Sequence, residues 1–227
     1  MKIYAFICTR SKDLSDTTNT LVSYLSSCNI DTKLLVGSES IFSGYQRAFD
    51  KTDPEDDDII ILCHDDIEIL SNKENFGKAL NKLADPKVGF VGPAGTTCLS
   101  QDAVWWNHTN WQQGKHRGLV FHGESLDKAE STYYGQSDRV VVLDGLFLAA
   151  KARTLKDIKL EKPEYLKGDW DFYDIHYTYT AHAKGYENHV VPLFILHNSF
   201  GELVGRDSWH DNRDRFIKRH KLPMEIK

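Results

Sequence analysis

The stretch "IIILCHDDIEIL", residues 59–70, joins a short apolar run directly to a cluster of polar groups that can hold a cation. Its first four residues are isoleucine or leucine, and Cys63, His64, Asp65 and Asp66 follow without a break. Such a short, β-branched run is typical of a buried strand. Carboxylate oxygens are ligands that suit Mg²⁺ and Mn²⁺. The end of this strand is therefore either a solvated acidic turn or a site for a cation.

Strands and helices alternate along the first part of the chain. Apolar runs predict strands at 2–9, 31–38, 59–63 and 87–97, and helical spacing of apolar residues predicts helices from about Asp16, at 39–51 and at 73–86. This alternation predicts an α/β fold in which helices flank a mostly parallel sheet. Ligands bind beyond the carboxyl ends of such strands. The residues that should converge there on one crevice are Thr9, Arg10, Ser38, His64–Asp66 and Gly95–Thr97.

Residues 98–137 show no clear hydrophobic period and hold Trp105, Trp106 and Trp111. They are expected to form a long functional loop that is mobile until a ligand binds. Beyond it, the pattern predicts β-structure at 138–153, a helix at 172–185, a late strand at 187–202 and a terminal helix at 208–221. The chain has no repeat and no low-complexity linker, so residues 1–227 are expected to form a single domain.

The composition is that of an ordinary globular protein, with 41% hydrophobic and 27% charged residues. A net charge of −5 argues against a general nucleic-acid binder. The N-terminal apolar run is too short for a secretory signal, and no stretch reaches the roughly 18–20 apolar residues of a membrane helix. The four cysteines form no CxxC pair and are expected to be reduced. We therefore expect a cytoplasmic protein without a transmembrane segment.

Two further polar sites stand out. Asp169, Asp171 and Asp174 lie just before or within the first turn of the helix predicted at 172–185. Capping explains one of them, but a carboxylate among aromatic residues has a raised pKa and can act as a general base toward a hydroxyl. His197 follows the apolar run "PLFIL" and is either a hydrogen-bonded structural histidine or a second ligand for a cation.

Four segments, in this order, resemble the family-2 glycosyltransferases of GT-A fold: the strand ending in "HDD", "VLDGLFLAAKA", "DFYDIHYTYTAHAKGY" and "LFILHNSFGE". They are most similar to the branch related to the streptomycin-biosynthesis protein StrF. The resemblance covers nearly the whole chain. Gln46, His176 and Thr180 depart from the residues that are usual in the family at these positions. The resemblance implies a single GT-A domain, with a nucleotide-binding half at 1–97 and an acceptor-binding and catalytic half at 98–227.

The resemblance also implies roles for individual residues. Asp66 and His197 would hold Mn²⁺ or Mg²⁺, with His64 in place of the family's first aspartate. Asp174 would be the catalytic base, although Asp171 remains an alternative. The residues implied to bind the nucleotide are Thr9, Arg10, Ser38, Tyr45, Arg47 and Asp65, and those implied to line the sugar pocket are Asp144 and Gly145. Trp106, with Trp105 or Trp111, can stack on a sugar face or belong to the core.

The implied activity is metal-dependent transfer of a hexose from a nucleotide-diphosphate sugar, with UDP favoured, to a hydroxyl of a glycan or another acceptor. Direct displacement would invert the anomeric carbon. Two other classes remain open. A nucleotidyltransferase needs a basic, glycine-rich segment after the first strand, and "TRSKDLSD" lacks the glycines. A non-catalytic carbohydrate-binding module would not need Asp66, Asp174 and His197 together.

Overall fold

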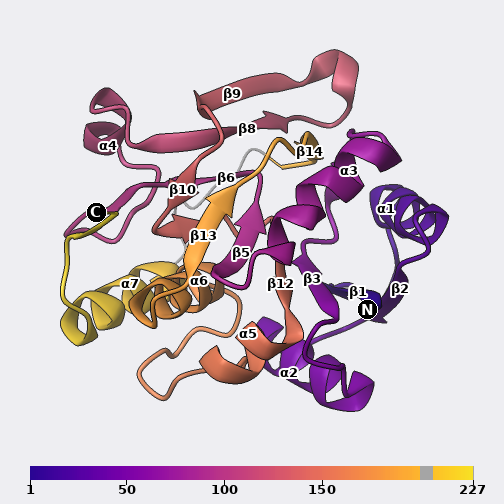
Figure 1. Cartoon of the computed structure of the whole chain (residues 1–227), viewed down its shortest axis with the longest axis horizontal. Coiled ribbons are helices and arrows are strands. Elements are labelled where there is room, and N and C mark those ends of the chain that lie inside the picture. Colours follow the sequence, from indigo (N-terminus) through magenta and orange to yellow (C-terminus); the bar gives the residue numbers. More distant parts are fainter. Residues whose placement is uncertain (200–206, 227) are drawn as a thin grey trace.

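The predicted strands of the first half belong to a seven-stranded sheet in the computed structural model, which describes residues 1–199 and 207–226 (Figure 1). The strands lie in the order β10 (Arg139–Val140), β13 (Glu187–Val190), β5 (Val88–Gly92), β12 (Phe147–Lys151), β3 (Ile59–Cys63), β1 (Ile3–Cys8) and β2 (Asp31–Leu35). β1 pairs in parallel with β2 and β3, and β13 pairs in parallel with β5. Only β12 and β10 run against the other strands of this sheet. The mostly parallel α/β sheet is confirmed.

Helices connect and cover the strands of this sheet. The described residues form α1 (Asp16–Ser27), α2 (Ile41–Thr52), α3 (Lys73–Leu80), α4 (His108–Gln112), α5 (Ala152–Ile158), α6 (Tyr173–Ala183) and α7 (Asp207–Arg219), with short 3₁₀ turns η1 (Asn81–Ala84) and η2 (Leu126–Lys128). Ser15 caps α1 by accepting a hydrogen bond from the Thr18 backbone N–H, and Ser40 caps α2 in the same way through Ser43. The helices predicted near Asp16, 39–51, 73–86, 172–185 and 208–221 are therefore present.

The segment 98–137 is not the irregular loop that its sequence suggests. It contains α4 and a β-hairpin of β8 (His116–His122) and β9 (Glu130–Gly135), which is visible beside α4 in Figure 1. β8 also pairs with β6 and β14 in a second sheet. That sheet has the order β11 (Val142–Leu143), β6 (Ala94–Thr96), β8, β14 (Ile195–His197) and β4 (Ile67–Ile69). Pairing on both sides stabilises β8, so it forms without the apolar alternation that identifies a strand in sequence.

The late strand predicted at 187–202 is two strands in different sheets. β13 lies in the first sheet and β14 in the second, with Pro192 between them. Proline cannot donate to a strand ladder, which explains the break. The last three residues of the predicted strand lie outside the described residues. Near the C-terminus, β15 (Met224–Glu225) pairs with β7 (Cys98–Leu99).

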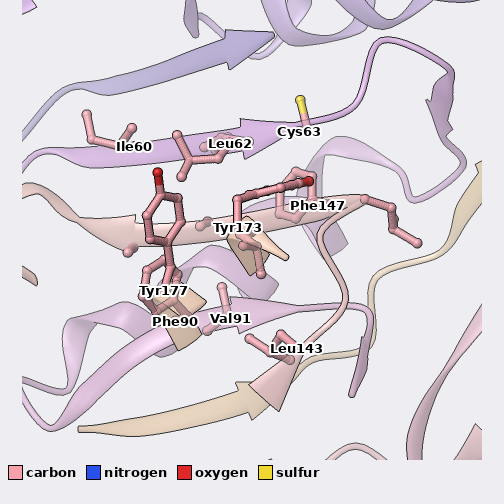
Figure 2. Close-up of a cluster of buried hydrophobic side chains, with 14 of the residues drawn as sticks. Ile60, Leu62, Cys63, Phe90, Val91, Leu143, Phe147, Tyr173 and Tyr177 are labelled. Carbon is pink, nitrogen blue, oxygen red and sulfur yellow. The ribbon is translucent and has the colours of Figure 1, made fainter. Parts of the chain in front are cut away.

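The core lies between the seven-stranded sheet and its helices. All five residues of β3 are buried, and Tyr173 and Tyr177 of α6 pack beside this strand (Figure 2). Cys8, Cys63 and Cys98 are buried, and all four cysteines are free. No helix in the described part of the chain has both the length and the apolar content needed to cross a membrane.

Candidate functional site

A pocket of about 1090 Å³ opens at the carboxyl ends of β1 and β3, where the sequence predicts a crevice. The predicted site residues that line it are Thr9, Arg10, Asp65, Asp66, Trp106, Asp144, Gly145, Asp171, Asp174 and His197. The structure brings together residues from both halves of the chain, so the pocket is formed only in the folded protein.

Three residues expected at the nucleotide lie outside this pocket lining. Tyr45 is fully buried and donates a hydrogen bond to the Cys63 carbonyl oxygen at 3.2 Å. Ser38 is buried and donates to the Leu35 carbonyl oxygen. Arg47 is exposed and donates to the Ser43 carbonyl oxygen on its own helix. The expected edge residues Gly95–Thr97 are buried in and next to β6.

Strand pairing brings His197 to the acidic motif. His197 lies opposite Ile67 in the antiparallel pair of β14 with β4, and the Asn198 backbone N–H donates to the Asp66 carbonyl oxygen at 2.8 Å. His197 Nε2 consequently lies 3.4 Å from Asp66 Oδ2. The two predicted ligands are thus neighbours although they lie 131 positions apart in the chain.

His64 joins this pair. Its Nδ1 lies 3.6 Å from Asp66 Oδ1, and ligand atoms of His64, Asp66 and His197 all lie within 4.8 Å of one another. The motif predicted an acidic cation site and assigned no ligand role to His64. Its position directly before the acid pair was the only signal in the sequence.

The donor set fits a divalent transition metal. Asp66 Oδ1 is buried and has no hydrogen-bond partner among the described residues, as expected for an atom whose partner is a cation. Burial acts to raise the pKa of Asp66, but the hydrogen bond with His197 and the charge that either histidine carries when protonated lower it, so the carboxylate is ionised. Burial lowers the pKa of His64 and leaves its imidazole neutral. Two imidazole nitrogens with one carboxylate suit Mn²⁺ better than Mg²⁺, which prefers oxygen ligands.

Asp174 is the most strongly perturbed carboxylate of the pocket. It lies in the first turn of α6, and its Oδ2 accepts a hydrogen bond from the Gly145 backbone N–H at 3.1 Å. Burial, and then the charge of Asp144, raise its pKa to about 7. A carboxylate with this pKa can take a proton near neutral pH. A larger residue at position 145 would force Tyr173 or Asp174 to shift, because a Cβ there would meet the Tyr173 hydroxyl and the Asp174 side chain.

Asp171 also lines the pocket but is tied to α7. Its Oδ2 accepts a hydrogen bond from Ser208 Oγ at 2.6 Å, and its backbone carbonyl accepts one from Asn212 Nδ2 at 3.0 Å. These contacts dock the loop before α6 onto the terminal helix. The acids at the start of α6 therefore have different partners, since Asp171 contacts α7 and Asp174 contacts Gly145.

An aromatic wall forms another side of the pocket. It consists of Trp105, Trp106, Trp111, Tyr134, Phe172 and Trp209. Trp105 is only 2% exposed and belongs to the core, whereas the Trp106 ring is partly exposed and lies 5.5 Å from the ring of Trp209. Trp111 is 44% exposed.

Sequence reasoning missed several lining residues. Glu130, Thr132 and Tyr134 alternate along β9 and therefore point to one face. Trp209 stands on α7, and nothing in its local sequence indicates the pocket. Trp170 also lines it, with the Arg10 guanidinium carbon 4.4 Å from its ring centre.

Solved structures share this fold. The crystal structure of A197 from STIV is 15% identical and superposes with a TM-score of 0.53, covering 87% of this chain and 85% of that one. GalNAc-T7, solved with UDP, GalNAc and Mn²⁺, is 10% identical with a TM-score of 0.58. This match covers 96% of the present chain but only 48% of the GalNAc-T7 chain. No curated protein matches the chain significantly.

The family comparison agrees with the fold and with the order of the motifs. The model described as "Glycosyltransferase like family" matches residues 8–220, which include every pocket residue named above. The GT-A architecture expected from the sequence is confirmed by the fold shared with GalNAc-T7. The chain therefore belongs to this glycosyltransferase-like family.

Proposed function

We propose that this protein is a metal-dependent glycosyltransferase that moves a hexose from a nucleotide-diphosphate sugar to an acceptor hydroxyl, with inversion at the anomeric carbon. One observation carries the proposal. The same pocket holds the His64–Asp66–His197 cluster and the half-buried carboxylate of Asp174, whose pKa is raised to about 7. A purely sugar-binding module needs neither a cation site nor a tuned carboxylate.

The donor side of the pocket is assigned to the ends of β1 and β3. Thr9, Arg10 and Asp65 line it and are proposed to contact the nucleotide. His64, Asp66 and His197 would hold Mn²⁺, which when bound neutralises charge on the leaving diphosphate. The GalNAc-T7 structure contains UDP and Mn²⁺, and for this reason UDP-sugars with Mn²⁺ are the first probes to test. The closer relation to the StrF branch stays a prediction from the motifs.

Asp174 is the proposed base. The acceptor oxygen attacks the anomeric carbon, the bond from that carbon to the diphosphate oxygen breaks, and the diphosphate leaves with the electron pair. The acceptor proton passes to the Asp174 carboxylate. Asp171 is the weaker candidate, because its carboxylate already accepts a hydrogen bond from Ser208 at 2.6 Å.

The acceptor is proposed to bind along the aromatic wall, with a sugar face against Trp106 and Trp209. Asp144 and Gly145 would lie at the transferred sugar. Six carboxylates line the described pocket (Asp65, Asp66, Glu130, Asp144, Asp171 and Asp174), whereas Arg10 is its one described permanent cation. This charge balance favours a neutral or amino-bearing acceptor over an anionic one. Residues 1–97 would thus supply most of the nucleotide site and residues 98–227 the acceptor site and base.

Calorimetric titration with UDP and UDP-sugars tests the proposal. Binding should require Mn²⁺, and Asp66→Ala should abolish the Mn²⁺-dependent part. Glu68→Ala is the matched control, because Glu68 lies two residues further along but does not line the pocket. Nucleotide binding that is equal with Mn²⁺ and with EDTA would contradict the proposed metal dependence.

A further inference from the structure

The hydroxyl of Tyr173 lies between the metal cluster and the proposed base. Tyr173 is the first residue of α6 and is only 4% exposed. Its hydroxyl donates a hydrogen bond to the Gly145 carbonyl oxygen at 2.8 Å and contacts His64 Nε2 at 2.9 Å. Tyr173 and both partners line the pocket, and the tyrosine ring also packs in the core (Figure 2).

These two hydrogen bonds determine the tautomer of His64. A phenol hydroxyl has one proton, and here Gly145 receives it. The contact to His64 can then be a hydrogen bond only if Nε2 carries the proton and donates it to the phenol oxygen. Nδ1 of the neutral ring, which lies 3.6 Å from Asp66 Oδ1, is left without a proton.

Two electron-rich atoms therefore face each other. Neither the Nδ1 lone pair nor Asp66 Oδ1, which has no described hydrogen-bond partner, has a proton to offer the other. The two atoms repel each other, and a cation bound between them removes the repulsion. In the opposite tautomer, the proton on Nδ1 would occupy the position of the cation. Metal-bound histidines generally keep their tautomer through a hydrogen bond on the other ring nitrogen.

The same glycine also holds the proposed base. Gly145 accepts the Tyr173 proton at its carbonyl and donates its N–H to Asp174 Oδ2 at 3.1 Å. His64, Tyr173, Gly145 and Asp174 thus form one hydrogen-bonded chain. Its two ends are a ligand of the metal cluster and the carboxylate that takes the proton.

We infer that Tyr173 is a positioning residue. It fixes His64 in the tautomer that can bind a metal, and it fixes the position of the metal site relative to Asp174. This inference rests on the proposed metal site. Tyr173 is inferred to act through its hydrogen bond with His64, so its effect must be visible in metal affinity itself, before any turnover.

Mn²⁺ titration of Tyr173→Phe, followed by calorimetry or by the EPR signal of free Mn²⁺, tests the inference. Loss of the hydroxyl should weaken Mn²⁺ binding by roughly 10- to 100-fold. Tyr177→Phe is the matched control. Tyr177 is a buried tyrosine one turn further along α6, and its hydroxyl donates to the Leu160 carbonyl oxygen, outside the pocket lining. Its affinity for Mn²⁺ should equal that of the wild type.

Equal Mn²⁺ affinity of Tyr173→Phe and the wild type would overturn the inference, as would an equal loss in both variants. If the wild type itself binds no Mn²⁺, the proposed metal site fails, which is a separate result. The ¹⁵N chemical shifts of His64 in the metal-free wild type supply a test that does not depend on a folded variant. The inference requires the Nε2–H tautomer, and an Nδ1–H tautomer would refute it.

Discussion

The proposed metal side and the aromatic wall of the pocket are built in different ways. On the metal side, His64 and Asp66 lie between the end of β3 and the start of β4, and His197 ends β14, which pairs with β4. On the aromatic side, Trp106 and Trp209 come from a loop and from α7, and meet only through packing. Changes on the first side should affect the chemical step, whereas changes on the second should affect acceptor binding or stability.

The largest effect is expected at Asp174. Asp174→Asn keeps the shape and can still accept the Gly145 hydrogen bond, but it cannot take the acceptor proton. kcat should fall roughly 10²- to 10⁴-fold while the dissociation constant of the donor stays nearly constant. With the wild type, kcat/KM should rise with pH up to about 7, where the carboxylate becomes ionised.

Asp171→Asn is the control for that variant and should cost far less activity. It weakens the contact with Ser208 and should therefore lower stability instead. If Asp171→Asn shows the large loss in kcat and Asp174→Asn does not, the assignment of the base must be reversed.

The adjacent pair Trp105 and Trp106 tests the division within the aromatic wall. Trp105→Ala empties a core position and should lower the free energy of unfolding by about 3–5 kcal/mol. Trp106→Ala should leave stability nearly unchanged and raise the acceptor KM. A stacking contact contributes about 0.5–1.5 kcal/mol, so the rise should be roughly 2- to 12-fold. Urea unfolding and acceptor kinetics measure the two effects, and similar behaviour of both variants would contradict the division.

The raised pKa of Asp174 also predicts that replacing its carboxylate stabilises the folded protein. Its folded-state value of about 7 exceeds the ordinary 3.8, so between these pH values the folded protein holds a proton that the unfolded chain has released. The free energy of unfolding should therefore fall as pH rises through this window. Asp174→Asn removes this dependence and should be more stable than the wild type at pH 8, by on the order of 2–4 kcal/mol, but not at pH 4. Equal stability at pH 8 would show that the carboxylate is not destabilised by burial.

The smallest effect concerns the hairpin in 98–137. β8 has partners on both sides, whereas β9 pairs only with β8. Hydrogen exchange in the free protein should be slow in β8 and faster in β9. If this segment closes over the donor, a nucleotide sugar with Mn²⁺ should slow exchange in β9 and the loop of Trp106 and leave β8 unchanged. Hydrogen exchange that is already slow throughout 98–137 in the free protein would contradict closure of this segment over the donor.

Much of the fold could be predicted, because its helices and its buried strands carry clear periodic patterns. β3 reads as a strand because residues 59–63 form a short apolar, β-branched run, and all five residues are buried in the structure. α1 reads as a helix because its cap, Ser15, and its inward Leu21 and Leu25 are local features. β8 and β9 could not be predicted, since their stability comes from pairing with neighbours that are distant in sequence.

The sequence by itself determined which groups meet at the end of β3, because an apolar strand followed by His64, Asp65 and Asp66 brings these three side chains to one strand end. It also identified Asp174 and His197 as candidates, through their motifs. Only the tertiary structure decided that Tyr45 is buried against Cys63, that Asp171 is engaged by α7, and that Trp209 meets Trp106. Local patterns depend on residues a few positions apart, whereas these contacts depend on how whole strands and helices pack against one another.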